Sequence, residues 1–260
     1  MFLQEKDFSF SVLDQHRSGD SPFGISGELL LAENGTEKYV VKHTDPFDAA
    51  VEYMAITLAT KLRLNCTPTA HLFAPSDRFP HAIGIQYLPD LNPPQKKDNV
   101  LKCIILNFLI ANGDHTEIGE SNGQIYTLDF GESFCFDFHN KTEAFLAQCR
   151  EAHTNKVIRD RIIPHFKTDF DRYLHMLGYA NEQNYYETAQ ILSQKNDIEP
   201  FTREEVHSEW THVWRRLVTL KDDAFNDMRS ELETVYGSFF AAVCYSVLMG
   251  LVSGTRNSKG

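Results

Sequence analysis

The sequence predicts an α+β protein in which a small N-terminal antiparallel sheet precedes a larger, mainly helical region. Strand-like apolar runs bounded by turn signals are concentrated in residues 1–90, whereas helical periodicity dominates the second half of the chain. The proline-rich segment Pro89–Pro94 separates the two patterns. We therefore expect a sheet lobe with one helix at residues 1–90 and a helical lobe at residues 91–260.

The strongest local signal in the first lobe is a β-hairpin. The runs Gly27–Ala32 and Lys38–Lys42 flank Asn34-Gly35, a dipeptide typical of hairpin turns. Asp45-Pro46 then ends the strand. The remaining elements expected here are a helix at Ala49–Leu62, a strand region starting at Thr67–Thr69 and a strand at Ala82–Leu88.

The second lobe begins with an apolar, and therefore buried, helix at Val100–Ala111. A short hairpin follows, with its turn at Ser121–Gln124, and Thr202–Glu205 resembles a capping box. The tail Ser253–Gly260 is expected to be frayed. Further helices are expected at Thr142–Arg150, Asp169–Leu177, Glu182–Gln194, Arg203–Leu220 and Asp222–Leu251.

Composition argues against several classes of function. The formal net charge is −11 and the chain has no Lys/Arg-rich run, so direct nucleic-acid binding is not expected. Five dispersed cysteines without a CxxC pair are typical of reduced thiols in a cytoplasmic protein. The first residues are acidic rather than basic, so no secretory signal is evident. The apolar run Phe239–Val252 is too short to span a bilayer, so no membrane association is expected.

Two aspartates stand where phosphoryl-transfer chemistry would need them. Asp114 lies in a polar loop after the apolar helix, and Asp129 follows the apolar strand Ile125–Leu128. Phosphoryl transfer requires a positioned nucleophile and metal ions over the phosphates, and one carboxylate could serve each requirement. Upstream, Lys42 ends an apolar strand and Glu52 lies on the following helix. A lysine stem buried in a strand needs an anionic partner, either a carboxylate or a ligand phosphate.

These residues resemble the HipA-like kinases, and especially their small single-domain relatives. The matching segments are Tyr39–Lys42, Glu52 through Leu64 and Pro68, Asn112-Gly113-Asp114, and Leu128-Asp129-Phe130-Gly131, within residues 25–137. The resemblance implies a protein-kinase-like two-lobed fold related to phosphatidylinositol kinases, with ATP and Mg²⁺ as cofactors and Ser/Thr phosphorylation as the activity. It also implies that Lys42 binds phosphate, Asp114 is catalytic and Asp129 binds the metal.

The chain departs from that family pattern at two places. The position of the family's second metal ligand, an Asn, is Gly119 here, and Glu117 is the expected replacement, with Asn122 as the other candidate. A loose Gly/Ser-rich segment, Ser18–Gly27, replaces a regular glycine-rich loop. The residues assigned to nucleotide binding are Lys42, Glu52, Ser21, Gly24, Gln86, Tyr87 and Leu88.

The predicted activity is transfer of the ATP γ-phosphate to an acceptor, with a protein Ser or Thr favoured and autophosphorylation included. Two alternatives stay open: a small-molecule or lipid kinase, and a pseudokinase that binds nucleotide or a partner without turnover. ATP and a protein substrate are the expected partners, and an antitoxin-like or regulatory protein partner stays open.

Overall fold

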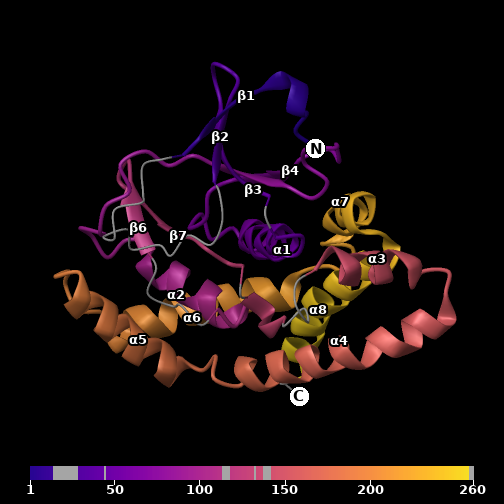
Figure 1. Cartoon of the computed structure of the whole chain (residues 1–260). Helices are drawn as coiled ribbons and strands as arrows, with labels where there is room; N and C mark the ends of the chain where they lie inside the picture. Colours follow the sequence, from indigo (N-terminus) through magenta and orange to yellow (C-terminus); the bar gives the residue numbers. More distant parts are fainter. Residues whose placement is uncertain (14–28, 44, 113–117, 132, 137–141, 258–260) are drawn as a thin grey trace.

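The structure is a computed structural model that describes residues 1–13, 29–43, 45–112, 118–131, 133–136 and 142–257. Within these residues, five strands form an antiparallel sheet in the order β1-β2-β3-β5-β4. Helix α1 (Asp48–Lys61) packs against β4 and β5, on the side of the sheet that faces the rest of the molecule (Figure 1). The strands are β1 (Ser9–Val12), β2 (Leu30–Glu33), β3 (Lys38–Lys42), β4 (Ala70–Leu72) and β5 (Ile83–Gln86).

The predicted β2–β3 hairpin is confirmed. Leu30 pairs with Val41 and Glu33 with Lys38, so the four residues between the strands form the loop. Asn34 closes this loop because its Oδ1 accepts hydrogen bonds from the backbone N–H of Thr36 (3.3 Å) and Glu37 (2.9 Å). Gly35 supplies the positive φ of +87° that the turn requires.

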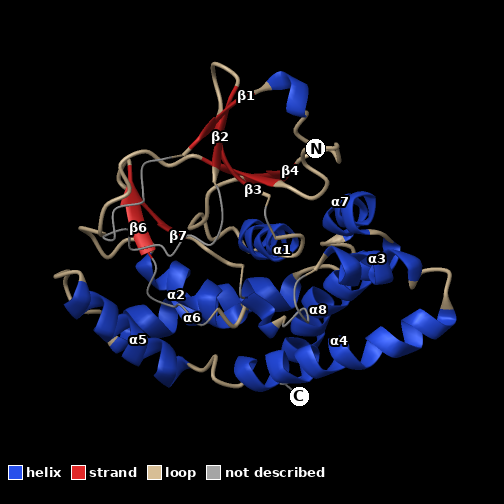
Figure 2. Ribbon diagram, in the orientation of Figure 1, coloured by secondary structure: helices blue, strands red, loops and turns tan. Residues whose placement is uncertain are grey.

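Beyond the sheet the chain is mainly helical, apart from one small hairpin (Figure 2). That hairpin consists of β6 (Ile118–Ser121) and β7 (Gln124–Thr127), and the turn lies at Asn122-Gly123 as predicted. The helices are α2 (Val100–Leu109), α3 (Glu143–Glu151), α4 (Lys156–Leu177), α5 (Glu182–Lys195), α6 (Arg203–Thr219), α7 (Asn226–Tyr236) and α8 (Ser238–Asn257), with short 3₁₀ turns at η1 (Glu5–Asp7) and η3 (Ser133–Cys135).

Three sequence expectations were wrong in extent, and one strand was missed. The helix expected at Asp169–Leu177 is only the last part of α4, which continues through Pro164 in its interior. The single helix expected at Asp222–Leu251 is two helices, because Gly237 adopts a φ of +88° and ends α7. Helix α8 then extends to Asn257, through most of the segment expected to fray. Strand β1, a short and mostly exposed edge strand, was not predicted.

One apolar core joins the sheet side to the helical side. It runs from α1 through α2 to α8, while a smaller cluster lies around Phe73 and Phe79 of the sheet region. Two buried tyrosines fix α2: Tyr173 donates to Leu109 O (2.7 Å) and Tyr185 donates to Leu101 O (2.9 Å). These two bonds connect both ends of helix α2 to helices α4 and α5.

The predicted α+β class, with a small antiparallel sheet followed by a mainly helical region, is confirmed. The lobe boundary near residue 90 stays a prediction. In the described part of the chain, no helix is long and apolar enough to cross a membrane.

Candidate functional site

The side chain of Lys42 is the centre of a group of three charged residues. Its ammonium forms an ion pair with Glu52 of α1, and its Nζ lies 3.0 Å from Asp129 Oδ1. The side chain of Lys42 is 25% exposed and that of Glu52 only 1%, whereas the carboxylate side chain of Asp129 is 40% exposed. One edge of this cluster is thus buried and the other is open to solvent.

The two carboxylates determine the charge of the lysine. Burial by itself lowers the pKa of Lys42, but Glu52 and Asp129 outweigh that effect and raise the pKa above its ordinary value. Burial raises the pKa of Glu52, and the Lys42 ammonium acts against that rise. The Lys42 side chain is therefore positively charged at neutral pH, next to the more exposed Asp129.

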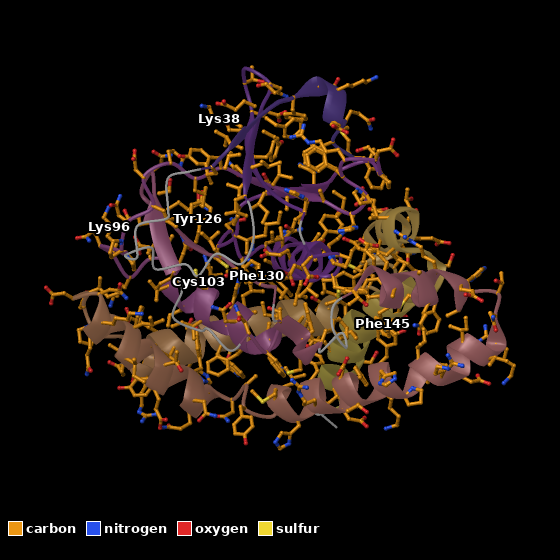
Figure 3. The ribbon with its side chains drawn as sticks, viewed as in Figure 1. Lys38, Lys96, Cys103, Tyr126, Phe130 and Phe145 are labelled. Carbon is orange, nitrogen blue, oxygen red and sulfur yellow. The ribbon has the colours of Figure 1, made fainter. Side chains whose placement is uncertain are left out.

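Two side chains from different segments of the chain form hydrogen bonds with the backbone around Asp129. Asp129 has a φ of +58°, a left-handed conformation that is uncommon for residues other than glycine. The N–H of Phe130 donates to Glu52 Oε1 (3.1 Å), and Asn112 Nδ2 donates to Asp129 O (3.3 Å). Phe130 itself is fully buried next to α1, in the middle of the molecule (Figure 3).

The next residue, Gly131, packs directly on α1. A Cβ at this position would lie 3.3 Å from Asp48 Oδ1, so a larger residue would press on that carboxylate. Asp48 and Glu52 are one turn apart on α1 and therefore share a face. Helix α1 thus contacts the Asp129–Gly131 segment with two carboxylates.

Several predicted site residues lie outside the described residues: Ser21, Gly24, Asp114 and Glu117. Their predicted roles stay predictions. The expectation that a strand begins directly after Glu117 is confirmed, since β6 begins at Ile118. Asn122 has a φ of +51° and serves the hairpin turn, which leaves Glu117 as the candidate for a second metal ligand.

A side chain at Gly119 would displace the side chain of Leu91. Gly119 lies in β6 opposite Tyr126, and a Cβ there would lie 2.6 Å from the side chain of Leu91. A separation below 3.0 Å would force Leu91 or the strand to move. An Asn at this position would therefore not fit the present packing, so any second metal ligand has to come from another residue.

Some polar groups of the predicted nucleotide-binding residues at the end of β5 are already hydrogen-bonded within the protein. The backbone N–H of Gln86 donates to Thr69 O (2.8 Å), and that of Tyr87 donates to Lys38 O (2.8 Å). The Gln86 side chain accepts from Thr69 Oγ1 (3.2 Å). Gln86, Tyr87 and Leu88 could still offer backbone carbonyls, and their role in nucleotide binding stays a prediction.

The donor type at Asp129 fits a magnesium ion, because Mg²⁺ prefers carboxylate oxygen, and this carboxylate is partly open to solvent. Among the described residues, no three His, Cys, Asp or Glu side chains are grouped as metal ligands. A magnesium site at Asp129 would therefore need additional ligands from water, from phosphate oxygens or from residues such as Glu117.

Sequence reasoning missed the polar residues beneath Asp129. Asn107, Asn112 and Thr127 are buried and are hydrogen-bonded to one another. A signal was present, because Asn107 is the single amide in the otherwise very apolar run of α2. Buried polar groups are costly unless they are paired, so an amide in such a run indicates a specific partner.

No family model matches the sequence, and no curated protein matches it. Among solved structures, the chain is similar to one described as the crystal structure of a Helicobacter pylori proinflammatory kinase, CtkA. The TM-score is 0.37 at 12% sequence identity, and the match covers 96% of this chain and 99% of that chain. The HipA-like resemblance therefore stays a hypothesis drawn from the motifs.

Proposed function

We propose that this protein is an ATP- and magnesium-dependent kinase that transfers the γ-phosphate to a protein Ser or Thr hydroxyl. The observation that carries the proposal is the cluster of Lys42, Glu52 and Asp129, in which residues far apart in the sequence meet at one partly open position. A lysine oriented by a helix-borne glutamate, next to a solvent-accessible aspartate, is the arrangement that protein kinases use to hold nucleotide phosphates and metal.

Each residue has a defined part in this proposal. Lys42 would bind phosphate oxygens, and Glu52 would keep its ammonium in place, since the glutamate is itself held by the Phe130 N–H. Asp129 would supply a carboxylate ligand for magnesium. When bound, magnesium neutralises phosphate charge. Asp114 would orient the acceptor hydroxyl or accept its proton.

The test is phosphotransfer from labelled ATP by the purified protein with magnesium, to itself or to added protein. Asp129→Asn should abolish transfer, because the amide loses the charge that holds the metal, while the thermal unfolding curve stays that of a folded protein. The matched control is Asp160→Asn, which removes a carboxylate from an ion pair with Lys156 on α4. Full activity in Asp129→Asn would remove the metal assignment.

Asp114→Ala should reduce the rate about a hundredfold or more, which is the order that positioned acid–base groups contribute. ATP affinity should change little, because the proposed role concerns the acceptor. An equal loss of affinity and rate would instead indicate a structural role for Asp114.

Glu117 is the proposed second metal ligand. Glu117→Gln should raise the magnesium concentration needed for half-maximal transfer, and Glu117→Asn should preserve part of the activity. If Glu117→Ala has the magnesium dependence of the parent, the residue has no part in metal binding.

The packing of Gly119 favours a second candidate, a pseudokinase that binds nucleotide without turnover. Gly119 does not supply the family's second metal ligand, and an Asn there would require Leu91 to move. Under this alternative the parent protein would bind nucleotide in an equilibrium titration but transfer no label. Transfer that Asp129→Asn removes would exclude it.

A further inference from the structure

A chain of buried amides connects helix α2 to the peptide bond between Asp129 and Phe130. Asn107 Nδ2 donates to Thr127 Oγ1 (3.1 Å), and Asn112 Nδ2 donates to Asn107 Oδ1 (3.3 Å) and to Asp129 O (3.3 Å). Asn107, Asn112 and Thr127 are all almost completely buried. An unpaired amide would be costly at this depth, so each partner constrains the next.

The end of α2 places Asn112 for this contact. The helix closes with a Schellman motif, in which Asn112 N–H donates to Asn107 O (2.9 Å) and Ala111 N–H donates to Phe108 O (3.2 Å). Ala111 adopts the left-handed conformation of that motif, with a φ of +51°. Asn107 and Asn112 are therefore joined twice, once through their backbones and once through their side chains.

The two bonds at Asp129 act on a single peptide unit. Its carbonyl oxygen, on Asp129, accepts from Asn112, and its N–H, on Phe130, donates to Glu52. A planar peptide fixed at both ends cannot rotate without breaking one of these bonds. Fixing this peptide unit fixes ψ of Asp129 and the position of its Cα, the atom from which the carboxylate side chain extends.

We propose that Asn107 is a positioning residue for metal binding, which acts through Asn112 to hold the Asp129–Phe130 peptide and so directs the Asp129 carboxylate. The inference rests on the proposed function, because it assigns Asp129 to magnesium. Asn107 touches neither nucleotide nor metal in this proposal. Groups that orient a metal ligand typically change metal affinity about ten- to hundredfold when they are removed.

Two measurements test the proposal, and one of them needs no nucleotide. The first is amide hydrogen exchange at Phe130, whose N–H is protected only while the peptide stays fixed. The second is the affinity for ATP with magnesium and with EDTA, measured by calorimetric titration. The variant is Asn107→Leu, which keeps the branching and the number of heavy atoms of the side chain and removes both hydrogen-bonding groups.

In Asn107→Leu, exchange at Phe130 should accelerate about tenfold or more, while exchange at Val51, which bonds to Phe47 O inside α1, stays unchanged. ATP affinity with magnesium should fall about tenfold, and affinity with EDTA should change less than about twofold.

The control is Ser193→Ala, which removes a buried hydroxyl that bonds to Ala189 O within α5. If Asn107→Leu does not fold, Thr127→Val gives the same test from the other side of the Asn107 amide. Unchanged exchange at Phe130 in a folded variant overturns the proposal, as does an equal loss of affinity with and without magnesium.

A failure of the proposed function can be distinguished from a failure of the Asn107 proposal. If the parent protein shows no magnesium-dependent affinity for ATP, the proposed function is wrong. Exchange at Phe130 still decides whether Asn107 fixes the Asp129–Phe130 peptide, because that readout needs neither metal nor nucleotide.

Discussion

The two lysines at the ends of β3 form the same kind of ion pair in different surroundings. Lys38 pairs with Glu33 across the β2–β3 hairpin, and their side chains are 56% and 36% exposed. Lys42 pairs with Glu52 on α1, and their side chains are 25% and 1% exposed. Within the part of the chain that the structure describes, only Lys42 has a second carboxylate partner, Asp129, which is 87 residues away in the sequence.

This difference indicates what each lysine is for. An exposed pair contributes little and is weakened by salt, so Lys38–Glu33 needs no explanation beyond solubility and hairpin register. A buried pair pays a desolvation cost that apolar residues would avoid, so stability alone does not explain Lys42–Glu52. The proposed function does explain it, because it requires a fixed positive charge next to Asp129.

The largest expected effect is that of Lys42→Met. Removing the ammonium leaves Glu52 buried without its main partner, which should lower the free energy of unfolding by about 3–5 kcal/mol and abolish phosphotransfer. Lys38→Met, at the other end of the strand, should leave both properties near those of the parent. Urea unfolding and the labelled-ATP assay measure the two effects. Equal effects of the two variants would mean that Lys42 and Lys38 do not differ in their importance for stability and phosphotransfer.

Glu52→Gln should have a smaller effect than Lys42→Met. The amide oxygen can still accept from the Phe130 N–H, but Lys42 loses its orienting charge and keeps only Asp129. We expect a phosphotransfer rate reduced about tenfold or more, with ATP affinity reduced as well. Glu33→Gln is the control and should leave the kinetics unchanged. Parent-like kinetics for Glu52→Gln would mean that Lys42 needs no orientation by α1.

The next largest effect should be on the pH dependence of stability. The pKa of Lys42 is raised above 10.5 in the folded protein, so its stabilising contribution is present below that pH and is lost as the pH rises above it. Urea unfolding from about pH 9 to about pH 11.5 should therefore show a shallower decline in Lys42→Met, by up to about 1.4 kcal/mol per pH unit. The ionisation of buried tyrosines and cysteines contributes equally to the decline in the parent and in Lys42→Met. Identical slopes would exclude a raised pKa at Lys42.

The smallest expected effect is that of salt. At about 1 M NaCl the screening length is near 3 Å, so any difference between Lys38→Met and the parent should vanish. The stability cost of Lys42→Met should persist, since its partner Glu52 is almost completely buried. Loss of that cost at high salt would indicate that the cluster is more open to solvent than its burial implies.

Local signals predicted much of the sheet region and the pairing of Lys42 with Glu52. The Asn34-Gly35 turn, the Asp45-Pro46 break and the helical spacing that follows all act within a few residues, so they can be read along the chain. The helical region was predicted less well. Pro164 does not interrupt α4, and only the backbone at Gly237 reveals that α7 and α8 are separate helices.

The sequence alone determined the α+β order, the β2–β3 and β6–β7 hairpins, and the candidate residues Lys42, Glu52 and Asp129, because each depends on side-chain type and short-range spacing. Only the tertiary structure decided which residues meet. It paired Lys42 with Asp129, filled the space at Gly119 with Leu91, and joined Asn107 to the Asp129–Phe130 peptide. These contacts depend on how α1, α2 and β7 pack together, and no local pattern in the sequence encodes that packing.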